Sequence, residues 1–278
     1  MTFNHLMLAG LVALTLGARP SGDDPRYLTV YLRGRKLDVR VYDPKPGTPR
    51  RNLDVLVASG DLGWLQLSGD VPRHLVARGY RVVGLNVMAY LNAFTGSDAP
   101  RLTDRDVAHD FKAIMEAASV DSSTPPPFVA IGVSEGASLA VMAAGQAEAS
   151  RLCRGVIGLG LPMYSEMAWR WTDFPSWITK AEPHEPLAAT RKYLEQLDVP
   201  LVVVHSIHDE YDPIDSVRAA VAHAPVPKRF YAINAPNHRF THHTGEVLRI
   251  VDNSLAWMDS LRVAPAQASA ALRNGAGD

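Results

Sequence analysis

The chain has 278 residues, of which 47% are hydrophobic, enough to bury the core of one large domain or two small ones. This hydrophobic content excludes an intrinsically disordered chain. The 28 lysines and arginines nearly balance the 29 aspartates and glutamates, which argues against a nucleic-acid partner because such a partner requires a basic excess. The single cysteine, Cys153, excludes an intrachain disulfide.

An apolar run covers residues 6–18 near the N-terminus. It is too short to anchor a protein in a bilayer, but it has the length of a secretion-signal core and is followed by a polar stretch. We therefore expect residues 1–18 to be a signal peptide and the protein to be exported, to the periplasm or beyond. Residues 1–5 contain no lysine or arginine, which counts against this. The alternative is an N-terminal element packed on the domain of a cytoplasmic protein.

Strand and helix patterns alternate along the chain after an opening hairpin, predicted over residues 27–42. Further strands are predicted at residues 54–59, 81–86, 128–133, 155–160, 201–205 and 229–233, and helices at 64–78, 104–118, 187–197, 214–222 and 245–261. This alternation predicts an α/β fold, with a mostly parallel central sheet and helices on both of its faces. Ligands of such sheets bind at the carboxyl ends of the strands.

Two segments depart from this alternation. Residues 161–186 combine prolines with three tryptophans, and we expect them to form a cap inserted over the C-terminal edge of the sheet. Residues 264–278 are alanine, glycine and mainly polar residues without periodicity, which predicts a flexible tail. The folded domain is therefore predicted to span residues 27–261, with the cap as an insertion within it.

The stretch 128–140 carries the strongest functional signal. Its apolar strand ends in Gly132-Val133-Ser134-Glu135-Gly136 and passes directly into a helix. A Gly-x-Ser-x-Gly sequence in this context is typical of the sharp turn that holds a nucleophilic serine above a sheet. Ser134 is therefore the candidate nucleophile. The backbone N–H of Glu135, at the start of the helix, is a candidate donor to an oxyanion.

A serine nucleophile needs a base within hydrogen-bond distance and an acid that orients this base. Asp209 follows the strand at 201–205, and His238 follows the last strand, which places nucleophile, acid and histidine in the order typical of one hydrolase fold. The alternatives for the acid are Glu210, Asp212 and Asp215.

The loop after the strand at 54–59 is the natural source of a second oxyanion donor. The backbone N–H of Asp61 is the favoured donor and that of Leu62 the next, and the alternative is an ordinary strand–helix turn. Trp64 and Trp169 are candidate substrate-binding residues. For both tryptophans the alternative is a place in the hydrophobic core.

Residues 27–261 as a whole resemble the α/β-hydrolase superfamily, on the three separated motifs just described. The sequence Ser59-Gly60-Asp61-Leu62-Gly63-Trp64, followed by residues 76–86, is similar to the bacterial virulence protein VirJ/AcvB group, which carries a Ser-Gly-Asp-Gly-Gly-Trp-like loop at this place. The resemblance implies a periplasmic serine hydrolase acting on lysyl-phosphatidylglycerol. A lipid substrate of this kind would bring the protein into peripheral contact with a membrane.

The chain departs from the pattern of that group at two positions. Leu62 replaces a glycine in the loop, and Glu135 follows the serine where a larger neutral residue is common. A carboxylate of Glu135 at the pocket rim would attract a cationic substrate. The alternative is a carboxylate that is stabilised by the N-terminus of its own helix.

Together these patterns predict a serine hydrolase that cleaves a carboxylic ester, small or lipid, through an acyl-enzyme. His238 takes the proton of Ser134, Asp209 orients His238, and the N–H groups of Glu135 and Asp61 bind the oxyanion. The mechanism requires no metal ion or organic cofactor. The alternatives are a non-catalytic binding protein of the cell envelope with the same fold, and an amidase, peptidase or acyltransferase that uses the same three residues.

Overall fold

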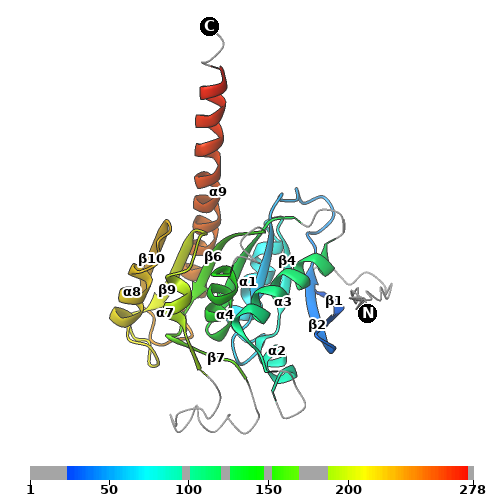
Figure 1. Cartoon of the computed structure of the whole chain (residues 1–278), viewed down its shortest axis with the longest axis vertical. Helices are drawn as coiled ribbons and strands as arrows, with labels where there is room; N and C mark the ends of the chain where they lie inside the picture. The colour runs from blue at the N-terminus through cyan, green and yellow to red at the C-terminus, as the bar shows by residue number, and fades with distance from the viewer. Residues whose placement is uncertain (1–23, 96–100, 120–125, 147–151, 169–186, 275–278) are drawn as a thin grey trace, which may run out of the picture.

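The computed structural model describes residues 24–95, 101–119, 126–146, 152–168 and 187–274, with side chains up to residue 261. An eight-stranded sheet lies at its centre, with helices on both faces (Figure 1). The strands are β1 (Arg26–Leu32), β2 (Arg35–Tyr42), β3 (Asp54–Ala58), β4 (Arg81–Leu85), β5 (Phe128–Val133), β6 (Cys153–Leu159), β9 (Leu201–Ser206) and β10 (Lys228–Ile233). The helices are α1 (Leu67–Val76), α2 (Val87–Ala93), α3 (Asp104–Ala118), α4 (Glu135–Ala144), α7 (Thr190–Leu194), α8 (Ile214–Ala222) and α9 (Thr244–Asn274).

The spatial order of the strands is β1-β2-β4-β3-β5-β6-β9-β10. The hairpin β1–β2 and the pair β2–β4 are antiparallel, and all other neighbours in this sheet are parallel. The prediction of a mostly parallel sheet after an opening hairpin is therefore confirmed. The parallel strands β3, β5, β6, β9 and β10 all end at the same edge of the sheet, which is where the candidate site residues follow them.

A separate hydrophobic cluster covers each face of the sheet. Along β5, Phe128 packs into one cluster and Val129 into the other, because successive side chains of a strand point to opposite faces. Phe111 of α3 belongs to the first cluster, and Leu75 of α1 and Val251 of α9 belong to the second. Burial on both faces explains why β5 is a continuous apolar run rather than an alternating one.

The predicted insertion begins and ends in a small antiparallel sheet of its own, formed by β7 (Tyr164–Glu166) and β8 (Leu187–Ala189). The helix predicted at 187–197 therefore begins only at Thr190, because the three residues before it pair with β7. Residues 169–186, the larger part of the predicted cap, lie outside the described residues, as does the predicted signal peptide at 1–18.

The C-terminal helix is longer than predicted. The sequence pattern predicts an end at Leu261 and a flexible tail from residue 264, whereas α9 continues to Asn274 and projects beyond the sheet (Figure 1). Residues 264–274 have no apolar periodicity but are rich in alanine, which has the highest intrinsic helix propensity. Within the described part of the chain, no helix is both long and apolar enough to span a membrane.

Candidate active site

Ser134 occupies a sharp turn between β5 and α4. Its φ of 51° and ψ of −121° lie in a region that side chains rarely adopt. A Cβ atom at Gly132 would lie 2.1 Å from the carbonyl oxygen of Gly136, and one at Gly136 would lie 2.4 Å from that of Ala58. Both glycines of the motif are therefore required for the close approach of α4 to the sheet, as the motif predicts.

The structure brings Ser134, His238 and Asp209 together, although 104 residues separate the first two. The Nε2 atom of His238 lies 2.9 Å from Ser134 Oγ, and its Nδ1 atom lies 2.7 Å from Asp209 Oδ2. An Nδ1–H that donates to the carboxylate leaves Nε2 free to accept the serine O–H. The three side chains thus form one continuous hydrogen-bonded chain that ends on a hydroxyl.

Charges around His238 determine its protonation. Burial alone lowers its pKa, but the hydrogen bond and charge of Asp209, followed by the charges of Glu210 and Asp61, raise the pKa above its ordinary value. For Asp209, burial acts to raise the pKa, and the contacts with His238 and two backbone N–H groups hold it below its ordinary value. The site therefore favours a carboxylate in contact with an imidazole that is more basic than usual.

The other three candidate acids do not contact the imidazole ring. Glu210 Oε2 accepts the backbone N–H of His238 at 2.7 Å, so it fixes the histidine through the main chain. The Asp212 carboxylate binds the backbone N–H of Met163, and Asp215 is exposed in the first turn of α8. All four acids lie within seven residues of the chain, so sequence position does not show which of them contacts His238. The tertiary contacts identify Asp209.

A second imidazole lies behind the first. His205, fully buried at the end of β9, has its Nε2 atom 3.3 Å from Asp209 Oδ2 and 2.9 Å from the backbone oxygen of Asp212. An Nε2–H directed at both oxygens holds the loop that carries Asp209. The position of His205 at a strand end predicts a hydrogen-bonded scaffold residue, but does not predict its contact with Asp209. The sequence feature that could have indicated this contact is the position of His205 at the end of a strand, four residues before Asp209.

The loop after β3 lies beside Ser134, as the oxyanion-donor prediction requires. The Leu62 N–H donates to Asp61 Oδ1 at 3.0 Å, which favours Asp61 over Leu62 as the second oxyanion donor. The Glu135 N–H lies at the first position of α4, where helix N–H groups have no partner within the helix. Both backbone donors remain predictions.

The Glu135 side chain is buried, although the residue lines a cavity beside Ser134. Its Oε1 atom accepts hydrogen bonds from the hydroxyls of Ser138 and Ser165 and from the backbone N–H of Glu166 at 3.1 Å. Burial raises the pKa of Glu135 to about 8, with the charges of Glu166 and Asp61 adding to the increase. The side chain instead joins the start of α4 to β7, at the base of the insertion.

The structure places Trp64 outside the cavities beside Ser134 and supports the alternative of a place in the hydrophobic core. Its indole ring packs over Gly84 of β4, where a Cβ would lie 2.5 Å from a ring carbon, and the Arg40 guanidinium stacks on it at 4.8 Å. The absence of a side chain at Gly84 leaves a space on β4 that the indole fills. The other candidate, Trp169, lies outside the described residues.

Two cavities flank Ser134 and His238. The narrower, of about 110 Å³, lies against the loop after β3, and the wider, of about 260 Å³, lies against the ends of the insertion. Tyr211 lines both and packs edge-on against His238, with ring centroids 5.2 Å apart. Sequence reasoning missed this tyrosine, although it lies two residues after Asp209. Among the described residues, no group of three or more histidine, cysteine or acidic side chains is placed to hold a metal ion.

The strand order and the serine turn define an α/β-hydrolase fold. Solved structures share it: Est1E from Butyrivibrio proteoclasticus has a TM-score of 0.61 and 14% identity, with 85% of this chain and 99% of that chain covered. An alpha-beta serine hydrolase homologue from Coxiella burnetii has a TM-score of 0.58 and 18% identity, with 83% and 97% covered. The esterase Pf2001 from Pyrococcus furiosus has a TM-score of 0.62 and 14% identity, with 91% and 98% covered.

The sequence itself identifies the family. Residues 52–208, more than half of the chain, match the family described as bacterial virulence protein (VirJ), and the chain belongs to this family. No curated protein matches the sequence. The predicted α/β-hydrolase fold and the resemblance to the VirJ group are thus confirmed.

Proposed function

We propose that this protein is a serine hydrolase that cleaves a carboxylic ester through an acyl-enzyme on Ser134. One observation carries the proposal: the hydrogen-bonded chain from Asp209 through His238 to Ser134, with contacts of 2.7 and 2.9 Å. The strained turn that presents Ser134 supports it, because such strain persists only where the surrounding structure enforces it. The esterases that share the fold support it as well.

The geometry suggests each step of the reaction. His238 Nε2 accepts the hydroxyl proton as Ser134 Oγ attacks the ester carbonyl, and Asp209 stabilises the imidazolium that forms. The N–H groups of Glu135 and Asp61 donate to the oxyanion of the tetrahedral intermediate. When the intermediate collapses, His238 donates the proton to the departing alcohol. A water molecule, deprotonated by His238, then releases the acid from Ser134.

An aminoacyl-phospholipid ester is the substrate that we propose for this site. Acidic residues, Glu166, Asp212 and the shared Asp61, line the wider cavity, and their charges suit a cationic aminoacyl group. Its other walls include exposed apolar side chains, Tyr164 and Leu187, at the ends of the insertion. Such a substrate fits a protein of the cell envelope, and we propose export through residues 1–18 and peripheral membrane contact on the same basis.

Labelling with a fluorophosphonate probe tests the nucleophile before any substrate is chosen. We expect the wild-type protein and Ser216→Ala, an exposed serine in α8, to be labelled, and Ser134→Ala to remain unlabelled. A folded wild-type protein that does not react would favour a non-catalytic binding protein instead. Rates on matched acyl esters and anilides then separate an esterase from an amidase, and aminoacyl esters test the proposed substrate.

A further inference from the structure

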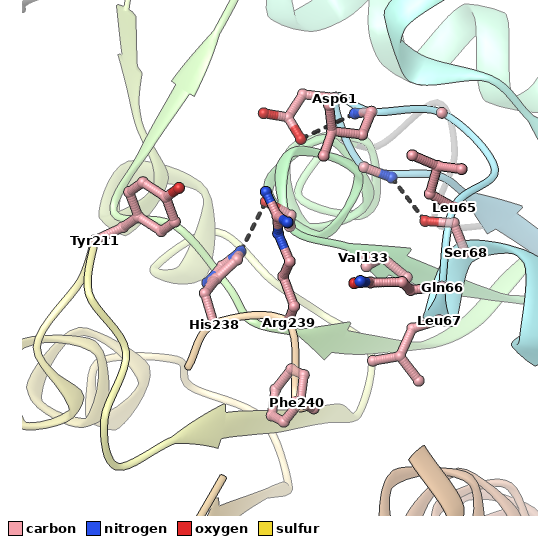
Figure 2. A pocket seen from close by; sticks show the side chains of 14 residues that line it. Asp61, Leu65, Gln66, Leu67, Ser68, Val133, Tyr211, His238, Arg239 and Phe240 are labelled. Atoms are coloured by element: carbon pink, nitrogen blue, oxygen red, sulfur yellow. Dashed lines mark hydrogen bonds between the residues drawn. The ribbon is translucent and has the colours of Figure 1, made fainter. Parts of the chain in front are cut away.

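Arg239 follows His238 directly and has no part in the proposed reaction, although it lines the narrower cavity beside Ser134. The turn that carries it is held by Asn237, whose side chain donates to Thr241 Oγ1 at 3.0 Å and accepts the Thr241 N–H at 3.2 Å. In Figure 2 the Arg239 side chain runs alongside His238 into the cavity. The fold therefore places Arg239 on the same cavity as Ser134 and His238.

The guanidinium of Arg239 is available to a ligand. It is exposed and, within the part of the chain that the structure describes, forms no hydrogen bond and no ion pair, although its charge acts on the carboxylate of Asp61. Arg33, by contrast, pairs with Asp106 and Asp110, each at 2.7 Å. An arginine without a carboxylate partner keeps its fork of N–H donors for another acceptor. Few acceptors match this fork as well as a carboxylate or a phosphate, which it binds through two parallel hydrogen bonds.

The two cavities differ in charge. Apart from Arg239, Asp61 and the shared His238, the residues that line the narrower cavity are uncharged. Asp61 lines both cavities, and one of its oxygens accepts the Leu62 N–H. The carboxylates of Glu166 and Asp212 line the wider cavity instead. A negative group on the substrate is therefore attracted to the Arg239 side of Ser134.

We propose that Arg239 binds an anionic group, a carboxylate or a phosphate, that the ester substrate carries next to its scissile bond. The inference rests on the proposed ester hydrolysis and adds a specificity-determining residue to it. The narrower cavity, of about 110 Å³, suits a compact charged group rather than a long acyl chain.

Two matched pairs of esters test this binding. The first pair is 4-nitrophenyl valerate and 4-nitrophenyl hydrogen glutarate, in which a carboxylate replaces the terminal methyl of the acyl chain. The second is 1-acetylglycerol and 1-acetylglycerol 3-phosphate, in which the charge lies on the alcohol side. The variants are Arg239→Gln, which removes the charge, Arg239→Lys, which keeps the charge but loses the fork, and Arg249→Gln, a control at an exposed arginine of α9.

We expect the kcat/KM ratio of anionic to neutral ester to fall about tenfold or more in Arg239→Gln for one pair, because a charge-assisted hydrogen bond is lost. Arg239→Lys should keep part of the preference and Arg249→Gln all of it. The pair that responds identifies the side of the ester that carries the anion. Because the ratio is independent of the folded fraction, partial unfolding does not mimic the effect.

Two results would overturn the inference in different ways. If both ratios in Arg239→Gln equal those of the wild-type enzyme, Arg239 does not recognise an anion, while ester hydrolysis itself stands. If the wild-type enzyme hydrolyses none of the four esters and does not react with the fluorophosphonate, the proposed function fails, and the inference about Arg239 fails with it.

Discussion

Replacement of Asp209 by asparagine tests how the structure orients His238. One carboxylate oxygen of Asp209 accepts the N–H groups of Tyr211 and Asp212 at 3.0 and 3.2 Å, so the amide oxygen of an asparagine has to take its place. The amide NH₂ then faces His238 Nδ1, where the carboxylate oxygen now lies at 2.7 Å. A donor at this place requires Nδ1 to accept, which puts the ring proton on Nε2. In this tautomer His238 cannot take the proton of Ser134.

We expect a large loss of activity in Asp209→Asn, because His238 keeps its position but can no longer act as the base. The same substitution in a serine protease lowers kcat by about 10⁴-fold, which corresponds to about 5.4 kcal/mol at 1.36 kcal/mol per tenfold change. The Asp209 side chain is fully buried, so water has no access to replace the lost acceptor. We therefore expect a fall in kcat of about 10⁴-fold for Asp209→Asn, with KM nearly unchanged.

The assay is steady-state hydrolysis of 4-nitrophenyl butyrate, with the unfolding temperature of each variant measured alongside. Asp215→Asn is the matched control, because Asp215 is one of the candidate acids but lies exposed on α8, and its activity should equal that of the wild type. The same substitution lowers the kcat of a serine protease about 10⁴-fold. If folded Asp209→Asn kept its activity within about tenfold of the wild type, the assignment of Asp209 would therefore be wrong.

Three further predictions concern pH and stability. The raised pKa of His238 places the acidic limb of the kcat/KM profile above the ordinary histidine value of about 6.5, and Glu210→Gln, which removes a charge that raises this pKa, should move the limb to lower pH. Because the pKa of Glu135 is about 8 in the folded protein and about 4.3 when unfolded, wild-type stability falls as pH rises between these values. Glu135→Gln should lose this dependence, so its unfolding temperature should exceed that of the wild type above pH 8. Gly132→Ala places a Cβ 2.1 Å from a backbone oxygen and should lower the free energy of unfolding, measured by urea denaturation, by about 3 kcal/mol. Gly245→Ala, with nothing within 4 Å of its Cβ, should not lower it.

Each of these three has a clear contrary result. An acidic limb that stays in place in Glu210→Gln would mean that this carboxylate does not act on His238. Parallel stability profiles for Glu135→Gln and the wild type would mean that Glu135 titrates alike in the folded and unfolded chain. A Gly132→Ala protein as stable as Gly245→Ala would mean that α4 approaches β5 less closely than the structure has it.

Local patterns predict the elements that depend on local properties. The apolar run of β5 and the helical spacing of α3 both appear in the structure close to their predicted bounds, because burial selects apolar residues at these positions. β8 was missed because Leu187–Ala189 is a strand only through its pairing with β7, which lies across the insertion. The far end of α9 was missed because helix propensity without an apolar face leaves no periodic signal.

The sequence alone determined the fold class, the serine turn and the short list of residues around it. These follow from chain-local properties: the period of the apolar residues, the need for glycine on both sides of Ser134, and the position of acids and histidines after strands. Tertiary structure alone decided which of four neighbouring acids contacts His238, that the Trp64 indole packs over Gly84, and that Glu135 is buried against β7. Such contacts depend on the relative placement of distant strands and loops, and no short stretch of sequence encodes that placement by itself.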